Sequence, residues 1–416
     1  MRRFLSLGLI GAALSLGAGP ALAQGKLRAE IMHWWTSGGE SAAVQEFQKA
    51  FNAAGGEWVD AAVAGGGGDA ARTAFMNRLA GGNPPTAMQF NTSKQFDDVI
   101  AAGQLIELDD VAQKDGWKGA VYGPVMDAVT RNGHVYAVPV NIHNNIWLWY
   151  NADVLKKAGV APPKTWDDLF ADFDKVKAAG VVPLAQAGDN WTKALTFFNV
   201  LLGEAGPPLY LKLFKDLDAD ATKTPEFKHV LETFGKLRNY VDNGVQGRQW
   251  NQAIGMVITG QAAFNFMGDW AKGEVVSAGQ TPGNPVGCIA GLGHPAYWIG
   301  GDVFVFAKQS DPEAIKGQKL LAHVMLSKET QVAFNAKKGS VPARLDVDNS
   351  KLDICAQQGL KILSENKDVV KGFDLYLTPD GVGQVYDAIG QFWSDPNETT
   401  DQLAGKFAEI LKNAKQ

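Results

Sequence analysis

Residues 27–91 read LRAEIMHWWTSGGESAAVQEFQKAFNAAGGEWVDAAVAGGGGDAARTAFMNRLAGGNPPTAMQFN, and this stretch decides the fold. Its apolar runs and helical spacings predict, in order, a strand, a helix, a strand, a glycine loop, a helix and a strand over 27–35, 36–54, 57–64, 65–68, 69–82 and 85–90. Short strands that alternate with amphipathic helices indicate right-handed βαβ units and a mostly parallel sheet.

The loops after these strands are the first candidates for a ligand site. Ligands on parallel sheets gather at the carboxyl ends of the strands, where the loops at Trp34, Gly65 and Asn91 are expected to lie. Gly65 to Gly68 precede a helix, but no phosphate-binding motif of the GxxxxGK[ST] or GxGxxG type is present. We therefore expect these glycines to form a flexible loop.

The pattern changes in RNGHVYAVPVNIHNNIWLWYNADVLKKAG at 131–159, where two strand-like runs indicate a crossing between domains. Longer helices follow, including one with Thr224 as its expected N-cap and Gly244 as its expected stop. A strand-then-helix pattern returns at 300–340, which suggests that the chain recrosses. We predict a first lobe from 26–138 plus 299–340 and a second from 139–298 plus 341–416.

Length, composition and charge exclude several classes of protein. The chain has 416 residues, of which 46% are hydrophobic and 20% charged, with a formal net charge of -5. This composition excludes disordered, collagen-like and coiled-coil chains, and the length predicts about two domains. Nucleic acid is not an expected partner, because binding to a phosphate backbone needs clustered Lys and Arg.

The first residues, MRRFLSLGLIGAALSLGAGPALAQ, have the pattern of a secretory signal peptide. Arg2 and Arg3 precede an apolar run, and Ala21-Leu22-Ala23 is a small-x-small cleavage pattern, so we predict a signal peptide over 1–23 and a periplasmic protein. No Cys follows the cleavage position to carry a lipid anchor. In an oxidising compartment Cys288 and Cys355 are expected either to pair or to remain buried thiols.

Twelve tryptophans are the most informative feature of the composition. Trp34 and Trp35 stand together beside Glu40, and a Trp ring matches the C–H face of a pyranose while carboxylates and amides bind its hydroxyls. The alternative is that both rings belong to the core. Because neighbouring residues of a strand point to opposite sides, we expect at least one of the two rings to contact a ligand.

No pattern in the sequence indicates a metal, a cofactor or a catalytic nucleophile. The six histidines show no HExxH or other metal spacing, two lone cysteines cannot form a zinc knuckle, and no GxSxG occurs. Carboxylates such as Glu40, Asp269 and Asp302 leave one enzymatic alternative, a secreted glycoside hydrolase, which needs two carboxylates across the scissile bond. A binding protein needs them only as hydrogen-bond acceptors.

The stretch YAVPVNIHNNIWLWYNADVLKKAGVAPPKTWDDLF at 136–170 resembles the solute-binding proteins of bacterial ABC sugar importers, the maltose-binding-like class. GQAAFNFMGDWAKGE at 260–274 and the runs at 90–111 and 300–344 are similar to the same class. MHWWTSGGESAAV and AGGGGDAARTAFMNRLAGGNPP are most similar to its periplasmic glucose-binding members. The resemblance implies an α/β, two-lobed, type II periplasmic-binding-protein fold with about three crossings, no enzymatic activity and no cofactor.

The resemblance also implies a ligand, partners and a site. The protein would close as a monomer on a sugar between its lobes and deliver it to membrane-embedded ABC permease subunits. Stacking is expected from Trp34 and Trp35, and hydrogen bonds to hydroxyls from Glu40, Asp302 and Lys338. Trp250 and Trp270 are expected to form the wall that the second lobe contributes. His143 and Asn144 in the crossing, and Asn91 in a loop, are expected to face the cleft.

Two departures leave the identity of the sugar open. The glucose-binding pattern has a basic or long polar residue near 91 and a His near 379, whereas this chain has Asn91 and Pro379-Asp380. Losing one buried hydrogen bond to a hydroxyl changes discrimination between sugars. A monosaccharide such as glucose is expected first, and another monosaccharide, a small oligosaccharide, a polyol or a non-sugar solute stays open. The mixture of Trp, Glu, Asp and Lys favours a neutral polyhydroxyl ligand over a polyamine or a phosphate ester.

Overall fold

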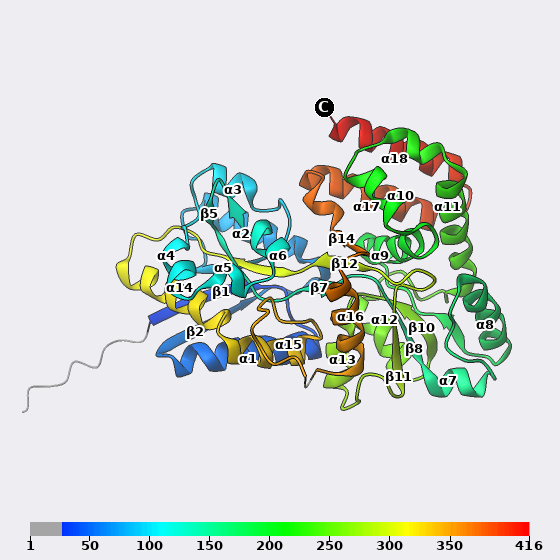
Figure 1. The fold of residues 1–416 in the computed structure, drawn as a ribbon, viewed down its shortest axis with the longest axis horizontal. Coiled ribbons are helices and arrows are strands. Elements are labelled where there is room, and N and C mark those ends of the chain that lie inside the picture. Colours follow the sequence, from blue (N-terminus) through cyan, green and yellow to red (C-terminus); the bar gives the residue numbers. More distant parts are fainter. Residues whose placement is uncertain (1–26, 351, 416) are drawn as a thin grey trace, which may run out of the picture.

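A computed structural model describes residues 27–350 and 352–415, so the predicted signal peptide lies outside the described residues. Figure 1 shows two α/β lobes side by side, one formed by the blue, cyan and yellow parts of the chain and the other by the green, orange and red parts. Each lobe has its own cluster of buried apolar residues. Within the described residues, no helix is both long and apolar enough to cross a membrane.

The first lobe contains a five-stranded sheet in the order β2-β1-β3-β13-β6. Its strands are β1 (Leu27–His33), β2 (Gly56–Ala62), β3 (Ala87–Asn91), β6 (Ala137–Pro139) and β13 (Asp302–Val305), beside a small pair, β4 (Thr130–Arg131) and β5 (His134–Val135). Its helices are α1 (Gly38–Ala53), η1 (Gly66–Gly68), α2 (Asp69–Ala80), α3 (Asp97–Ala101), α4 (Asp109–Lys114), α5 (Trp117–Ala120), α6 (Gly123–Ala128), α14 (Pro312–Met325) and α15 (Lys328–Lys338).

The second lobe contains a four-stranded sheet in the order β11-β8-β10-β9. Its strands are β8 (Trp147–Asn151), β9 (Val182–Leu184), β10 (Ala262–Phe266) and β11 (Val286–Ala290). Its helices are α7 (Ala152–Lys157), α8 (Trp166–Ala178), α9 (Asn190–Val200), η2 (Leu201–Ala205), α10 (Gly206–Phe214), η3 (Ala219–Lys223), α11 (Pro225–Leu237), η4 (Arg238–Tyr240), α12 (Trp250–Ile258), α13 (Ala271–Ser277), η5 (Phe373–Leu375), α17 (Pro379–Ser394) and α18 (Thr400–Ala414).

Both sheets are mixed, which refines the expectation of mostly parallel sheets. β1 runs parallel to β2 and β3, as the βαβ pattern predicts, but β13 is antiparallel to both β3 and β6. In the second lobe β8 is antiparallel to β10 and β11, and only β9 and β10 are parallel. Parallel neighbours need a long crossover connection, whereas β8 and β13 enter their sheets directly from the other lobe and run against the βαβ strands.

A third, three-stranded sheet joins the lobes in the order β14-β12-β7, formed by β14 (Val369–Lys371), β12 (Tyr297–Gly300) and β7 (His143–Asn144). Side chains of β12 alternate between the lobes, because Tyr297 and Ile299 pack in the first apolar cluster and Trp298 packs in the second. Val341 and Ala343 also pack in the first cluster. The crossings place β7 and β12 directly at the lobe interface.

Two local expectations have opposite outcomes. Thr224 caps α11, since its hydroxyl accepts a hydrogen bond from the backbone N–H of Phe227 at 3.3 Å. The predicted stop at Gly244 is wrong, because α11 ends at Leu237 and continues only as the short η4. There the Arg238 guanidinium donates to the carbonyl of Phe392 at 2.7 Å, which fixes the chain against α17.

Cys288 and Cys355 form a disulfide, which answers the question that the sequence left open. The bond joins β11 to α16 (Ile354–Glu365), the helix that follows the third crossing. Helix α16 contacts both apolar clusters, because Cys355 packs in the second and Ala356 and Leu363 pack in the first. The disulfide therefore anchors the returning chain to the second lobe.

Candidate functional site

A cleft of about 730 Å³ separates the two lobes and is lined by residues of both. Eight of the residues predicted from the sequence line this cleft, namely Trp34, Glu40, Asn91, His143, Trp250, Trp270, Asp302 and Lys338. Trp34 follows β1, Glu40 lies in the first turn of α1, and Asn91 ends β3, while His143 lies on β7 and Asp302 on β13. Trp250 begins α12, Trp270 directly precedes α13, and Lys338 ends α15. Pockets of this size are typical of small-molecule sites.

The two adjacent tryptophans after β1 have different environments. Trp34 lines the cleft, whereas Trp35 is 1% exposed and packs against Phe304 and Phe334 with ring centroids 5.6 and 5.2 Å apart. The alternation of side chains along an extended segment accounts for this division. The structure thus brings Trp34 to the cleft and places Trp35 in the core of the first lobe.

The glycine loop is packed against the aromatic rings of the cleft. A Cβ atom on Gly68 would lie 2.6 Å from the Trp34 ring, and Gly68 has a φ of +80°. Cβ atoms on Gly66 and Gly67 would come within 3.0 Å of Trp250 and 3.1 Å of Trp191. Only residues without a side chain allow the backbone to approach three indoles this closely, so the glycines position the rings of the cleft wall.

Glu40 and Lys338 form a buried pair in the first lobe beside the cleft. The Nζ of Lys338 lies 3.3 Å from Oε1 of Glu40, and the Ser37 hydroxyl donates to Oε2 of Glu40 at 3.1 Å. Burial raises the pKa of Glu40, although the charge of Lys338 opposes the shift. Lys338 also lies 5.8 Å from the centroid of the Trp270 ring, so its ammonium faces an aromatic wall of the second lobe.

Asp302 is held in its position by three side-chain hydrogen bonds. Its Oδ1 accepts a hydrogen bond from the Gln89 amide at 3.0 Å, and its Oδ2 accepts from Asn141 at 2.8 Å and from His143 Nε2 at 2.9 Å. Burial acts to raise the pKa of Asp302, but the hydrogen bond and charge of His143 outweigh it and lower the pKa to about 2. Asp302 is therefore ionised at neutral pH, as an acceptor of ligand hydroxyls needs to be.

Asn144 does not line the cleft. Its carboxamide oxygen accepts from the backbone N–H of Trp298 at 3.0 Å, and its amide donates to the carbonyl of Ala296 at 3.3 Å. These bonds tie β7 to β12 within the crossing sheet. Asn144 thus has a structural place behind the site, next to its neighbour His143, which lines the cleft.

Sequence reasoning missed several residues that line the cleft. Trp191 lies at the start of α9 and lines the cleft. Its position could have been predicted, because it follows the loop at the carboxyl end of β9. Asp374 and Tyr386 in the C-terminal part of the second lobe gave no signal, because their approach to the cleft depends on the third crossing. Burial raises the pKa of Asp374 to about 7.

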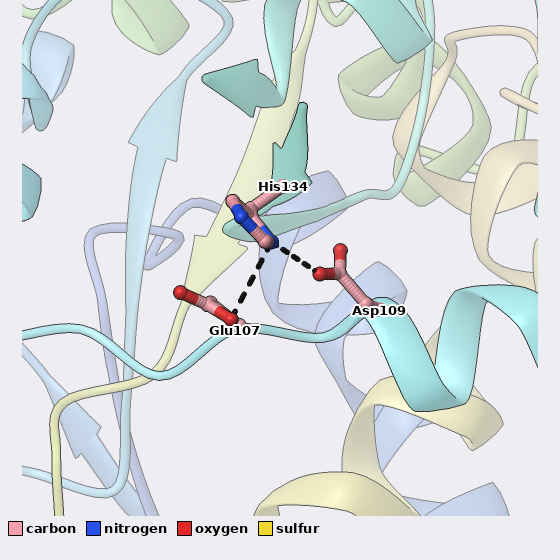
Figure 2. A group of neighbouring side chains, drawn as sticks. All are labelled: Glu107, Asp109 and His134. Atoms are coloured by element: carbon pink, nitrogen blue, oxygen red, sulfur yellow. Dashed lines mark hydrogen bonds and ion pairs between the residues drawn. The ribbon is translucent and has the colours of Figure 1, made fainter. Parts of the chain in front are cut away.

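A separate cluster of Glu107, Asp109 and His134 has ligand atoms within 4.8 Å of one another, the spacing that a metal ion requires (Figure 2). None of the three lines the cleft, and His134 and Glu107 are exposed. The hydrogen bond from His134 Nδ1 to Asp109, at 2.6 Å, raises the pKa of His134. A surface imidazole paired with carboxylates accounts for this arrangement without a metal.

Comparison with known proteins agrees with this architecture. Residues 35–332 match the family described as bacterial extracellular solute-binding protein. A probable sugar-binding periplasmic protein of Mesorhizobium japonicum is 40% identical over 415 residues, covering 98% of this chain and 99% of the relative. A protein of the same description from Brucella suis is 40% identical over 365 residues, covering 87% of this chain and 86% of the relative.

The fold comparison gives the same result. A chitin oligosaccharide binding protein superposes with a TM-score of 0.78 at 18% identity, covering 94% of this chain and 99% of that chain. At this identity the likeness concerns the fold alone. With its two lobes, its interlobe cleft and a family match that spans most of its length, the chain belongs to the bacterial extracellular solute-binding proteins, which bind solutes and are not enzymes.

Proposed function

We propose that this protein captures a sugar in the interlobe cleft in the periplasm and delivers it to the permease of a bacterial ABC transporter. The observation that carries the proposal is the meeting of aromatic rings with fixed hydrogen-bonding groups in one cleft. Trp34, Trp250 and Trp270 supply flat apolar faces, and Glu40 and Asp302 supply carboxylates. Rings that face C–H surfaces and carboxylates that accept from hydroxyls suit a pyranose.

The charges of the site support a neutral ligand. Lys338 lies against Glu40, and His143 lies between Asp302 and Asp269, so each of these three carboxylates already contacts a basic side chain. A phosphate ester would favour a surplus of basic groups, and a polyamine would favour unpaired carboxylates. Paired charges can still hydrogen-bond hydroxyl groups, because a carboxylate has several lone-pair directions.

Closure of the two lobes supplies the mechanism. A sugar that contacts both lobes binds the closed arrangement more tightly than the open one and shifts the population toward it. Trp34 and Asp302 belong to the first lobe, whereas Trp250 and Trp270 belong to the second, so one ligand can bridge them. The permease then distinguishes the closed, loaded protein from the open one.

A monosaccharide such as glucose is our first candidate, and the size of the cleft favours a small oligosaccharide as the second. At about 30 Å³ for each water, 730 Å³ equals the volume of about 24 waters, and one hexose has about half that number of non-hydrogen atoms. Asn91 and Pro379 line the cleft at the positions where the chain departs from the glucose-binding pattern. A polyol stays a third candidate.

Export and oligomeric state belong to the same proposal. We infer cleavage of the signal peptide after Ala23, and relatives named periplasmic support this location. The protein is expected to act as a monomer, because the ligand bridges two lobes of one chain. Mass spectrometry of the exported protein and its elution volume in size exclusion test the two statements.

Intrinsic tryptophan fluorescence tests the choice of ligand. The mature protein, stripped of bound solute, is titrated with glucose, galactose, mannose, xylose, sorbitol and a series of small oligosaccharides. Saturable change with one or a few of these sugars, each recovered unaltered, is expected because Trp34, Trp191, Trp250 and Trp270 line the cleft. Silence toward every sugar and polyol, with a response to a charged solute, would overturn the proposal.

A further inference from the structure

His143 uses both of its ring nitrogens on carboxylates from different lobes. It lies on β7, the first crossing, and its Nε2 is 2.9 Å from Oδ2 of Asp302 on β13 in the first lobe. Its Nδ1 makes a short contact with Asp269, which follows β10 in the second lobe. Asp269 also accepts from the backbone N–H of Asn144 at 2.8 Å, which fixes the second carboxylate against the crossing.

The imidazolium form can donate a hydrogen bond to both carboxylates at once. A protonated ring donates from both nitrogens, whereas a neutral ring would point a lone pair at one of the two carboxylates. Burial by itself lowers the pKa of His143, but the charges and hydrogen bonds of Asp269 and Asp302 outweigh it and raise the pKa. The positive charge therefore persists above the ordinary titration range of histidine and is lost only as pH rises through the raised pKa.

The surrounding groups do not replace His143 in this role. Of the nearby charged side chains, Lys338 is paired with Glu40, and Lys272 is paired with Asp353 at 2.7 Å. The Trp270 ring meets the imidazole edge-on at 5.1 Å and offers no proton acceptor. The Asn141 amide nitrogen lies 3.1 Å from His143 Nε2 and also donates to Asp302 at 2.8 Å, but it carries no charge. The charged groups that act on His143 are therefore Asp269 and Asp302.

We propose that the His143 imidazolium is a proton-dependent tie between the lobes, which holds Asp302 toward the ligand and favours the closed arrangement. Loss of the proton leaves Asp269 and Asp302 facing an uncharged ring, so one hydrogen bond and both attractions are lost and the lobes separate more easily. The inference rests on the proposed function only where it concerns ligand affinity. His143 is then a positioning residue, which acts on the ligand through Asp302.

The test begins with the ligand-free mature protein and the variants His143→Gln and His134→Gln. His134→Gln is the matched control, because His134 also lies between two carboxylates, Glu107 and Asp109, but on the surface (Figure 2). Ring-nitrogen NMR shifts report the protonation of His143, and the radius of gyration from small-angle scattering reports lobe opening. Both are recorded from about pH 5 to about pH 9, below the range in which most lysines titrate.

We expect His143 in the wild type to stay doubly protonated beyond the ordinary range and the radius of gyration to rise as it titrates. The radius of gyration of His134→Gln should rise with pH as it does in the wild type. His143→Gln should lack this pH-dependent step and should have the larger radius of gyration of the open arrangement at every pH. Titration of His143 near the ordinary value of about 6.5, or an unchanged step in His143→Gln, would overturn the tie. If His143→Gln does not fold, Asp269→Asn, which removes one carboxylate charge, is expected to lower the pH of the step.

Glucose titrations of the same proteins keep this inference separate from the proposed function. Where glucose binds the wild type, we expect His143→Gln to bind it at least about tenfold more weakly at neutral pH, the loss typical of a hydrogen bond to a charged group. Equal affinity would refute the positioning of Asp302 by His143. Absence of sugar binding together with an intact pH-dependent step would count against the proposed function and leave the tie established.

Discussion

Replacing Asp302 by Asn perturbs the cleft at a carboxylate that three side chains hold in place. The substitution keeps the size of the side chain but removes its charge, and its new amide group cannot accept from Gln89, Asn141 and His143 together. A hydrogen bond between a ligand hydroxyl and a charged group contributes about 1.5–3 kcal/mol. At about 1.4 kcal/mol for each tenfold change, sugar affinity should fall by about tenfold to about a hundredfold.

Isothermal titration calorimetry measures this loss with the sugar that gives the strongest fluorescence response. The matched control is Asp127→Asn, which changes the same charge at an exposed position outside the cleft and should bind like the wild type. A thermal melt of each variant shows whether the fold is intact. Affinity of Asp302→Asn within about twofold of the wild type would refute the reasoning that this carboxylate contacts the ligand.

Three further predictions separate structural from binding residues. Trp35→Ala should lower the free energy of unfolding by about 3–5 kcal/mol in urea melts because it empties the core, whereas Trp34→Ala should weaken sugar binding with a smaller change in stability. Cys288→Ser, which leaves Cys355 unpaired, should cost about 2–4 kcal/mol in calorimetric melts, because the disulfide closes a loop with a sequence separation of 67. Because the pKa of Asp374 is raised to about 7, the folded state keeps a proton that the unfolded state releases at about pH 4. The free energy of unfolding should therefore fall as pH rises from about 4 to about 7. Urea melts of Asp374→Asn should lack this part of the pH dependence. The first two predictions are contradicted if Trp35→Ala or Cys288→Ser unfolds with the same free energy as the wild type. The third is contradicted if the stability of Asp374→Asn depends on pH as the wild type's does.

The sequence predicts the parts of the fold that depend on local periodicity. The β1-α1-β2-α2-β3 order follows from spacings within 27–91. The Thr224 cap was predictable because its hydroxyl accepts a hydrogen bond from the first turn of the helix that directly follows it. The direction of β8 and β13 could not be predicted, because it depends on crossings between lobes that are distant in the chain. The pairing of Cys288 with Cys355 is of the same kind, since no local pattern brings the two together.

The candidate site divides in the same way. Adjacent residues on an extended segment point to opposite sides, so the chain shows that Trp34 and Trp35 differ but not which one faces the cleft. The glycines at 65–68 read as a flexible loop, because one sequence does not reveal the indole rings that pack on them. Asp374 reaches the cleft only through the third crossing, which carries no sequence motif.

A crystal structure of the mature protein with the sugar that gives the strongest fluorescence response tests the central claim most directly. We predict the sugar in the interlobe cleft, with one hydroxyl within hydrogen-bond distance of Asp302 and one ring face against Trp34, Trp250 or Trp270. A sugar bound outside the cleft, or a charged solute retained in the cleft in place of added sugar, would contradict the claim.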